Sequence, residues 1–358
     1  MAQWFSGGDD VAKKQNTDNG LRDLKQALKD KNPGRLYFFY GEETFLLSYH
    51  LDRLKKLILD PVTESFNFHR FTEETWSMTD FADALEMLPM MAEKTMVQVD
   101  DVELFKLPED ERNRLAEVFR DIPSYCTVVF TYLTAPWKPD KRMRKLWEAM
   151  ESSGLVVEFA RQDQRDLVPW VGRHFAAHDK RISTELCMYL IEITGGTMTA
   201  LNGEIEKICA FSGAPEICRA DIDAVTEPVL DAVVFQMTDM LCAGDYRGAL
   251  EKLNQLLKMQ QEPIPILGAV GSSFRRLSAA RVFLDRGKGP YELQDFLGIW
   301  DKAARQAMTA ARNLSPNFLR RASELIIETD YRMKTSFDDQ QRLLEMMILT
   351  LAQEAKHG

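Results

Sequence analysis

The order of apolar and polar positions divides the chain into two parts. Short apolar runs at residues 36–40, 95–99, 126–132 and 155–159, together with an alternating pattern at residues 66–71, predict five strands. Stretches with apolar residues at helical spacing separate these strands, which is typical of a three-layer α/β domain with a mainly parallel sheet. Beyond this part the strand signals stop and only helical patterns follow.

These patterns predict four segments. A polar start rich in Gly, Asp and Asn favours a disordered tail over residues 1–19. The α/β domain follows over residues 20–160, and a small helical domain over residues 161–228. Adjacent helices joined by short breaks predict a helical bundle over residues 229–358.

The first strand ends at a turn whose sequence bears on function. A P-loop ATPase carries its phosphate site at such a strand–turn–helix, and needs a second glycine, a lysine and a Ser or Thr there. The turn reads Gly41, Glu42, Glu43 and Thr44, so it lacks the lysine and places two carboxylates where phosphates would lie. Like charges in a partly dry site repel by several kcal/mol, to order of magnitude. The sequence therefore predicts the shape of a nucleotide-binding unit without its chemistry; the alternative is an ordinary strand–turn–helix.

Two places suggest metal ligands. Asp100 and Asp101 follow a predicted strand directly, like the magnesium-binding second motif of ATPases. Without an upstream phosphate lysine, a solvated strand end is the favoured interpretation. His174 and His178 are four residues apart on a predicted helix, but no Glu or third ligand accompanies them as in HExxH, so two solvent-side histidines are favoured. We predict no metal.

Composition narrows the class of protein. The chain has 358 residues, of which 45% are hydrophobic and 28% charged, as in soluble globular proteins. It has no apolar run long enough to span a bilayer, and its start has no secretory h-region, so we predict a cytoplasmic protein without membrane contact. Five cysteines without a CxxC pair indicate reduced, mostly buried thiols: Cys126, Cys187, Cys209, Cys218 and Cys242.

Charge argues against strong independent DNA binding. The formal net charge is −10, whereas a protein that binds DNA alone usually presents a basic face. Local basic clusters remain candidates for contact with nucleic acid or a subunit, although solvated helix faces are favoured: residues 136–145, Arg275 with Arg276, and Arg320 with Arg321.

Several segments together resemble a known family. The segments YGEETFLL at residues 40–47, LNGEIEKICAF at 201–211 with ADIDAV at 220–225, and the long stretch from 235 to 277 resemble the delta subunit of the bacterial DNA polymerase III clamp loader. The resemblance runs over residues 20–355. Each segment is moderately specific, and their order makes the resemblance strong.

The resemblance implies an architecture and a role. The α/β domain would be AAA+-like with a degenerate P-loop, followed by a helical lid domain and a C-terminal helical collar domain. The family's delta subunit binds the ring-shaped sliding clamp (the beta subunit) and holds it open without binding ATP or another cofactor. Its implied partners are the gamma/tau and delta-prime subunits, and primed DNA within the complex. It would not be an enzyme by itself, and would belong to a DNA-directed DNA polymerase, a transferase, by complex membership alone.

The family's clamp-binding element is a hydrophobic pair, usually Leu-Phe, at the tip of a helix just before a strand. The matching positions are Met90 and Met91, preceded by Leu88 and Pro89. A predicted helix over residues 77–88, with Thr79 as its N-cap and Leu88 on its apolar face, would lead to this tip. Methionine suits adaptable binding surfaces, although losing the aromatic ring would weaken the anchor by about 1 kcal/mol. Without the family, a methionine pair after a helix is more often core.

A second site residue follows from the resemblance. The family often has an aromatic residue near Phe337 that can lie against the primer-template junction, where base stacking stabilises by ~1–3 kcal/mol. The alternative is that Phe337 packs on Leu343 or Leu344 at a helix start.

Three other functions stay open from the sequence. The chain would be a degenerate P-loop ATPase that uses Asp100 and Asp101 for magnesium, a delta-prime type of subunit, or a helical scaffold unrelated to replication. The delta-prime type is expected to show cysteine-rich zinc spacing and a Ser-Arg-Cys motif, and neither occurs in this sequence.

Overall fold

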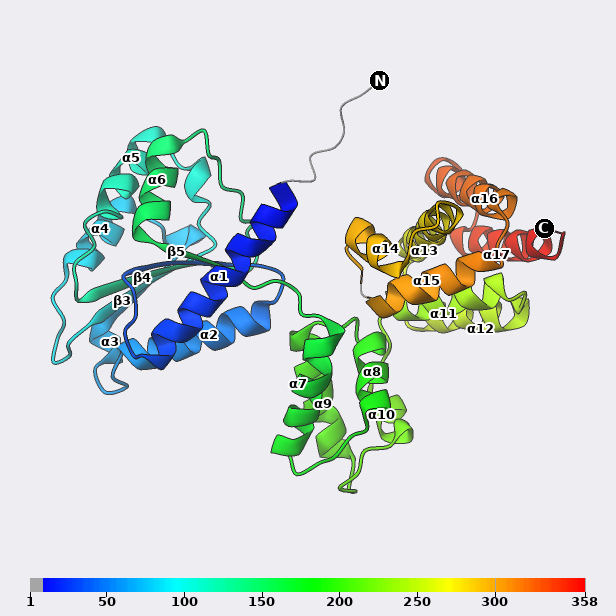
Figure 1. The fold of residues 1–358 in the computed structure, drawn as a ribbon, viewed down its shortest axis with the longest axis horizontal. Coiled ribbons are helices and arrows are strands. Elements are labelled where there is room, and N and C mark those ends of the chain that lie inside the picture. Colours follow the sequence, from blue (N-terminus) through cyan, green and yellow to red (C-terminus); the bar gives the residue numbers. More distant parts are fainter. Residues whose placement is uncertain (1–8, 300, 358) are drawn as a thin grey trace. The chain divides into compact units, whose positions relative to one another are not determined.

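The computed structural model describes residues 9–299 and 301–357 (Figure 1). The chain divides after Gln162 into two compact units, which we describe separately. The predicted further division of the second unit, into residues 161–228 and 229–358, stays a prediction.

The first unit contains a five-stranded sheet in the order β2-β3-β4-β1-β5. All neighbouring strands pair in parallel, with Phe38 opposite Phe130 in the β1–β4 pair and Phe68 opposite Met96 in the β2–β3 pair. This confirms the predicted parallel α/β sheet. The strands are β1 (Leu36–Tyr40), β2 (Phe68–Thr72), β3 (Thr95–Asp100), β4 (Cys126–Tyr132) and β5 (Leu155–Glu158).

Helices cover both faces of the sheet because alternate side chains of each strand point to opposite faces. Phe38 packs into one core and Phe39 into the other. On the Phe39 face lie α1 (Asp9–Lys29) and α2 (Thr44–Ile58); on the Phe38 face lie α4 (Met78–Glu86), α5 (Glu109–Val118) and α6 (Arg144–Ser153) (Figure 1). The remaining short elements are α3 (Glu64–Asn67), η1 (Glu73–Thr75) and η2 (Leu104–Lys106).

Three sequence predictions in this unit are corrected. Residues 9–19, expected in a disordered tail, belong to α1; several are good helix formers and no proline interrupts them. Residues 1–8 of that predicted tail lie outside the described residues. β2 starts two residues later than predicted because α3 occupies the preceding turn. The cap of α4 is Ser77 rather than Thr79: the Ser77 side chain accepts a hydrogen bond from the Asp80 N–H.

The second unit is helical in all its described elements. The buried faces of α11, α12, α13, α16 and α17 share one hydrophobic core, and α13, α14 and α15 share another. Within the described residues, no helix is both long and apolar enough to cross a membrane. The helices are α7 (Gln164–Ala177), α8 (Thr184–Ile193), α9 (Met198–Phe211), α10 (Arg219–Val225), α11 (Leu230–Cys242), α12 (Tyr246–Lys258), α13 (Pro263–Asp285), α14 (Pro290–Leu297), α15 (Asp301–Arg312), α16 (Pro316–Thr335) and α17 (Gln340–His357).

Candidate functional site

The two predicted sites of the first unit lie at opposite edges of its sheet. Because all strands are parallel, their carboxyl ends meet at one edge and their amino ends at the other. The Gly41 turn follows β1, and Asp100 and Asp101 end or follow β3, so these residues share the carboxyl edge. Met90 and Met91 precede β3 and therefore lie at the amino edge.

At the carboxyl edge, the turn between β1 and α2 packs against its own chain. Gly41 has φ +135°, and a Cβ there would lie 2.3 Å from the Phe159 carbonyl oxygen. The Glu43 N–H donates to that same oxygen at 2.9 Å, and the Thr44 N–H donates to Glu42 O at 3.2 Å. Two N–H groups of the turn are thus committed to protein carbonyls, whereas a phosphate cradle needs such groups to face the ligand.

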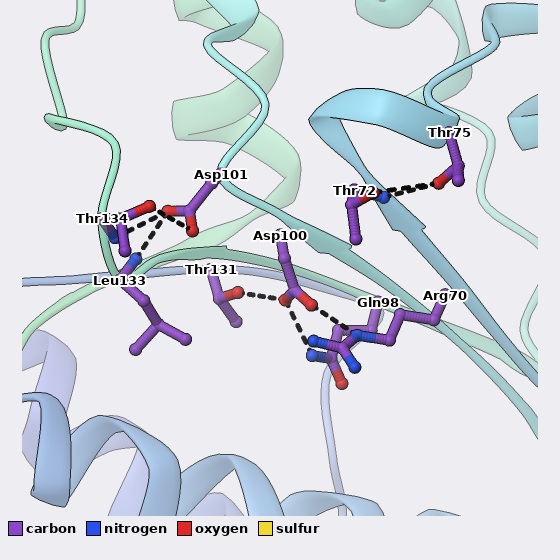
Figure 2. A network of polar contacts seen from close by, with 9 residues as sticks. All are labelled: Arg70, Thr72, Thr75, Gln98, Asp100, Asp101, Thr131, Leu133 and Thr134. Atoms are coloured by element: carbon purple, nitrogen blue, oxygen red, sulfur yellow. Dashed lines mark hydrogen bonds and ion pairs between the residues drawn. The ribbon is translucent and has the colours of Figure 1, made fainter.

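Asp101 secures the loop after β4, as Figure 2 shows. Its Oδ1 accepts from the N–H groups of Leu133, Thr134 and Ala135 at 2.8, 2.9 and 3.0 Å, and its Oδ2 accepts from the Thr134 hydroxyl at 2.8 Å. Partial burial acts to raise the pKa of Asp101, but these hydrogen bonds outweigh it and the pKa is lowered. The carboxylate is therefore a structural anchor for residues 133–135.

Asp100 is buried and also has internal partners (Figure 2). Its Oδ2 accepts from Arg70 Nε at 2.6 Å, and its Oδ1 accepts from Gln98 Nε2 at 2.7 Å and from the Thr131 hydroxyl. The interpretation of both aspartates as a solvated strand end is wrong for Asp100, whose exposed fraction is 4%. A buried carboxylate requires such partners, and here Arg70 supplies the opposite charge.

A cavity of about 350 Å³ opens beside the Gly41 turn. One part of its lining is the stacked pair of Tyr40 and Trp137, whose ring centroids are 5.1 Å apart. Glu42 and Glu158 also line the cavity, and Glu158 accepts a hydrogen bond from the Tyr40 hydroxyl at 3.3 Å. These two carboxylates oppose the binding of a polyphosphate in this cavity.

At the amino edge, residues 87–94 form a loop between α4 and β3, which we call the tip loop. α4 ends at Glu86, so Leu88 leaves the predicted helix face and is 74% exposed. Met90 and Met91 are 56% and 94% exposed, and the interpretation of this pair as core is therefore wrong. Met91 has φ +52°, the left-handed region that side chains other than glycine seldom adopt.

The tip loop is attached to the turn before β2 through Asn67, a residue that sequence reasoning missed. The Asn67 side chain accepts from the Met90 N–H at 2.8 Å and donates to the Met90 carbonyl at 2.9 Å. Its amide also donates to Thr63 O at 3.1 Å. Asn67 precedes Met90 by 23 residues, so no local sequence pattern predicts this contact. The pairing of β2 with β3 brings the two residues together. Two exposed apolar side chains, Val62 and Phe66, immediately precede Thr63 and Asn67 in the chain.

In the second unit, Phe337 lies in the turn between α16 and α17 and is fully exposed. The alternative in which Phe337 packs on Leu343 or Leu344 is wrong, because those two residues are buried without covering the Phe337 ring. The adjacent Asp338 carboxylate accepts from Arg332 at 2.8 Å.

The predicted basic clusters differ in their exposure and in their charged partners. Arg320 and Arg321 both pair with Glu324, at 2.7 and 3.3 Å, on exposed α16 surface. Arg276 is partly buried, contrary to the solvated face expected there, and burial lowers its pKa while Asp231 and Asp239 act to raise it. Arg275 is exposed, as expected of a helix surface.

The predicted histidine pair is not brought together with further ligands. His174 Nδ1 lies 2.9 Å from the Trp170 carbonyl oxygen, and the His174 and Trp170 rings are in contact, with centroids 3.7 Å apart and an interplanar angle of 34°. His178 is exposed. Over residues 9–299 and 301–357, no group of three His, Cys, Asp or Glu side chains is arranged to hold a metal ion.

Comparison with known proteins matches both units. Residues 37–160 match the family described as DNA polymerase III, delta subunit, and residues 231–351 match the C-terminal domain of the DNA polymerase III delta subunit. Together the two matches cover more than half of the chain. The chain belongs to the DNA polymerase III delta subunit family. It is thus a component of a clamp loader and takes part in DNA replication, and the resemblance seen in the sequence is confirmed.

Individual relatives agree with this family. The chain is 26% identical to DNA polymerase III subunit delta of Bacillus subtilis over 334 residues, which covers 92% of this chain and 96% of the relative. It is 23% identical to the probable DNA polymerase III subunit delta of Aquifex aeolicus, over 74% of this chain and 76% of the relative. In fold it is similar to the Bacillus subtilis DNA clamp loader delta protein, with a TM-score of 0.60, 24% identity and coverage of 92% and 99%.

These matches exclude two of the three alternatives that the sequence left open. The family described is delta, so the delta-prime type and a scaffold unrelated to replication are both wrong.

Proposed function

We propose that this delta subunit binds the sliding clamp through the tip loop and holds the ring open. The observation that carries this proposal is the exposure of Met90 and Met91, at 56% and 94%, on a loop whose backbone is fixed by a buried side chain. A large exposed apolar side chain on a fixed backbone meets a partner without first losing loop entropy. Leu88, which is 74% exposed, and Pro89 precede the two methionines on the same loop.

The mechanism is a shift between two states of the clamp. Burial of each methionine in an apolar groove contributes up to about 2 kcal/mol. That energy opens the ring only if the tip loop binds the open form of the clamp more tightly than the closed form. The groove must therefore fit the tip loop best in a clamp shape whose subunit interface cannot close. The sheet behind the tip loop, whose β3 is buried along its whole length, provides the rigid support.

We infer that the subunit does not itself bind or hydrolyse ATP, and needs no cofactor for its role. This is supported by the short Gly41 turn with its committed N–H groups, and by the internal partners of Asp100 and Asp101. The ATP would be used by the gamma/tau subunits. Association with these and with delta-prime would use the helices of residues 229–358, and the complex would act on primed DNA in the bacterial cytoplasm.

Phe337 is a second contact in this proposal. Its fully exposed ring would stack on a base at the primer-template junction, worth ~1–3 kcal/mol. The neighbouring Arg332 is paired with Asp338, so the contact would come from the ring rather than from free positive charge.

Ring opening is the direct test. A donor and an acceptor fluorophore are placed on the two sides of one interface of the clamp ring, and the subunit is added without nucleotide. The proposal predicts a saturable loss of energy transfer. Saturable binding without any change in energy transfer would contradict the opening step and leave clamp binding intact.

A further inference from the structure

We propose that Asn67 is a positioning residue for the clamp-binding tip: its side-chain amide fixes the backbone of Met90 and thereby sets the direction in which Met90 and Met91 project. This inference rests on the proposed function, because it concerns how that same surface reaches the clamp. Asn67 itself has an exposed fraction of 1%, so it acts through the tip loop and not by contact with the partner.

The Asn67 side chain hydrogen-bonds to the Met90 backbone as the backbone of a neighbouring strand would. Both hydrogen-bonding groups of the Met90 backbone are taken by one amide, the N–H at 2.8 Å and the carbonyl at 2.9 Å. The second N–H of the amide is held by Thr63 O at 3.1 Å, so the amide cannot rotate without breaking three hydrogen bonds. Asn67 immediately precedes β2, and β2 pairs with β3, so the amide is carried by the sheet itself.

The tip loop needs such support. Its residue Met91 has φ +52°, a conformation that is unfavourable for a side chain and persists where the surroundings impose it. The hydrogen bonds of Asn67 with the Met90 N–H and with the Met90 carbonyl restrict the backbone immediately before Met91. Without them the loop would relax, and the two methionines would be presented in many orientations, most of them unsuited to one groove.

The chemistry is specific to asparagine. The Asn67 side chain accepts a hydrogen bond from one backbone N–H and donates to two carbonyls. This requires an amide oxygen and an amide nitrogen on a side chain as short as that of asparagine. Aspartate has the same shape but is an acceptor only when ionised, so Asn67→Asp would keep the contact with the Met90 N–H and place a carboxylate against two carbonyl oxygens. The substitution therefore removes the hold with little change in size.

The test compares Asn67→Asp with Asn202→Asp in the full chain. Asn202 is a matched control, since its amide donates at 2.8 Å to Glu206 on α9, far along the chain from the tip loop. We expect Asn67→Asp to bind the sliding clamp about tenfold more weakly than wild type, and Asn202→Asp to bind as wild type does. Hydrogen exchange of the peptide covering residues 87–94 should accelerate in Asn67→Asp in the free subunit.

A double-mutant cycle separates positioning from general stability. In the Met90→Ala/Met91→Ala background the Asn67→Asp effect on binding should vanish, because Asn67 acts through those side chains. An effect that persists there would overturn the inference, as would wild-type affinity in Asn67→Asp. Should Asn67→Asp not fold, Asn67→Ala, which removes the amide without adding charge, takes its place in both measurements.

Failure of the proposed function would look different. If the wild type itself did not bind the clamp, the proposed function would be contradicted, and exchange in the free subunit would still decide the role of Asn67. Equal exchange rates for residues 87–94 in wild type and variant would overturn it.

Discussion

The carbonyl oxygen of Phe159 lies so close to Gly41 that a Cβ at residue 41 would be 2.3 Å from it. The same oxygen accepts the Glu43 N–H, so the residue that directly follows β5 closes the turn that follows β1. The turn is thus packed against the chain's own backbone, and glycine is required at residue 41 by both the close contact and the positive φ.

Gly41→Ala should therefore destabilise the first unit. The φ of +135° is strained for any side chain, and the new Cβ would force β5 away; we expect a loss of about 2 kcal/mol or more in the free energy of unfolding. Urea unfolding followed by circular dichroism measures it. Gly203→Ala is the matched control: it lies within α9 with open space around its Cα, and should change stability by less than about 1 kcal/mol, in the stabilising direction. Equal stability of Gly41→Ala and wild type would contradict this account of the turn.

Asp101→Asn should weaken the attachment of the loop after β4. The variant replaces charge-assisted hydrogen bonds to three backbone N–H groups by neutral ones, which should cost about 1–2 kcal/mol near neutral pH. The pKa of Asp101 is lowered in the folded protein, so its contribution is present above the unfolded value near 3.8 and is lost as the pH falls below it. Unfolding measured at pH 7 and at pH 2.5 should show the difference between wild type and variant shrinking at the lower pH.

The same pair of proteins tests the ATPase alternative. Magnesium with ATP should leave the thermal midpoint of the wild type unchanged. A shift in the wild type that Asp101→Asn abolishes would point to metal binding at this aspartate.

His50 should make the first unit sensitive to acid. Burial, with the positive charges of Lys25 and Arg53, lowers the pKa of His50 from 6.5 to about 4. Between these values the unfolded chain takes up a proton that the folded protein refuses, so stability falls as the pH drops through this window. From pH 7 to pH 5 the loss is roughly 2 kcal/mol.

His50→Gln should flatten the dependence of stability on pH. His178→Gln, a substitution at an exposed position, should leave this dependence as it is in the wild type. The measurement is urea unfolding at pH 7 and pH 5 for the three proteins. An unchanged pH dependence in His50→Gln would show that another group is responsible.

The sequence was most informative where periodicity is strong. The buried strands around Phe38 and Val97 followed from short apolar runs, and their parallel pairing from the helices between them. The missing lysine after Gly41 could be read directly, because a P-loop is defined by residues adjacent in the chain.

Contacts between distant residues could not be read in this way. The hydrogen bonds from Asn67 to Met90, and from residues 133–135 to Asp101, depend on which strands are neighbours and in which register. An asparagine before a strand and an aspartate after one are common, and neither reveals its partner. Likewise, the exposure of Met90 and Met91 depended on α4 ending at Glu86, and element ends are weakly encoded locally.

The most direct test of the account is binding of the isolated subunit to its sliding clamp, by calorimetry, for wild type and Met90→Ala/Met91→Ala. Met346→Ala is the matched control, because this methionine is 54% exposed on α17, close to the 56% of Met90. We predict tight binding by wild type and control, a loss of about 2 kcal/mol or more in the double variant, and equal unfolding midpoints for all three, since these side chains are exposed. Tight binding that survives the double substitution would contradict the central claim that the tip loop is the clamp-binding site.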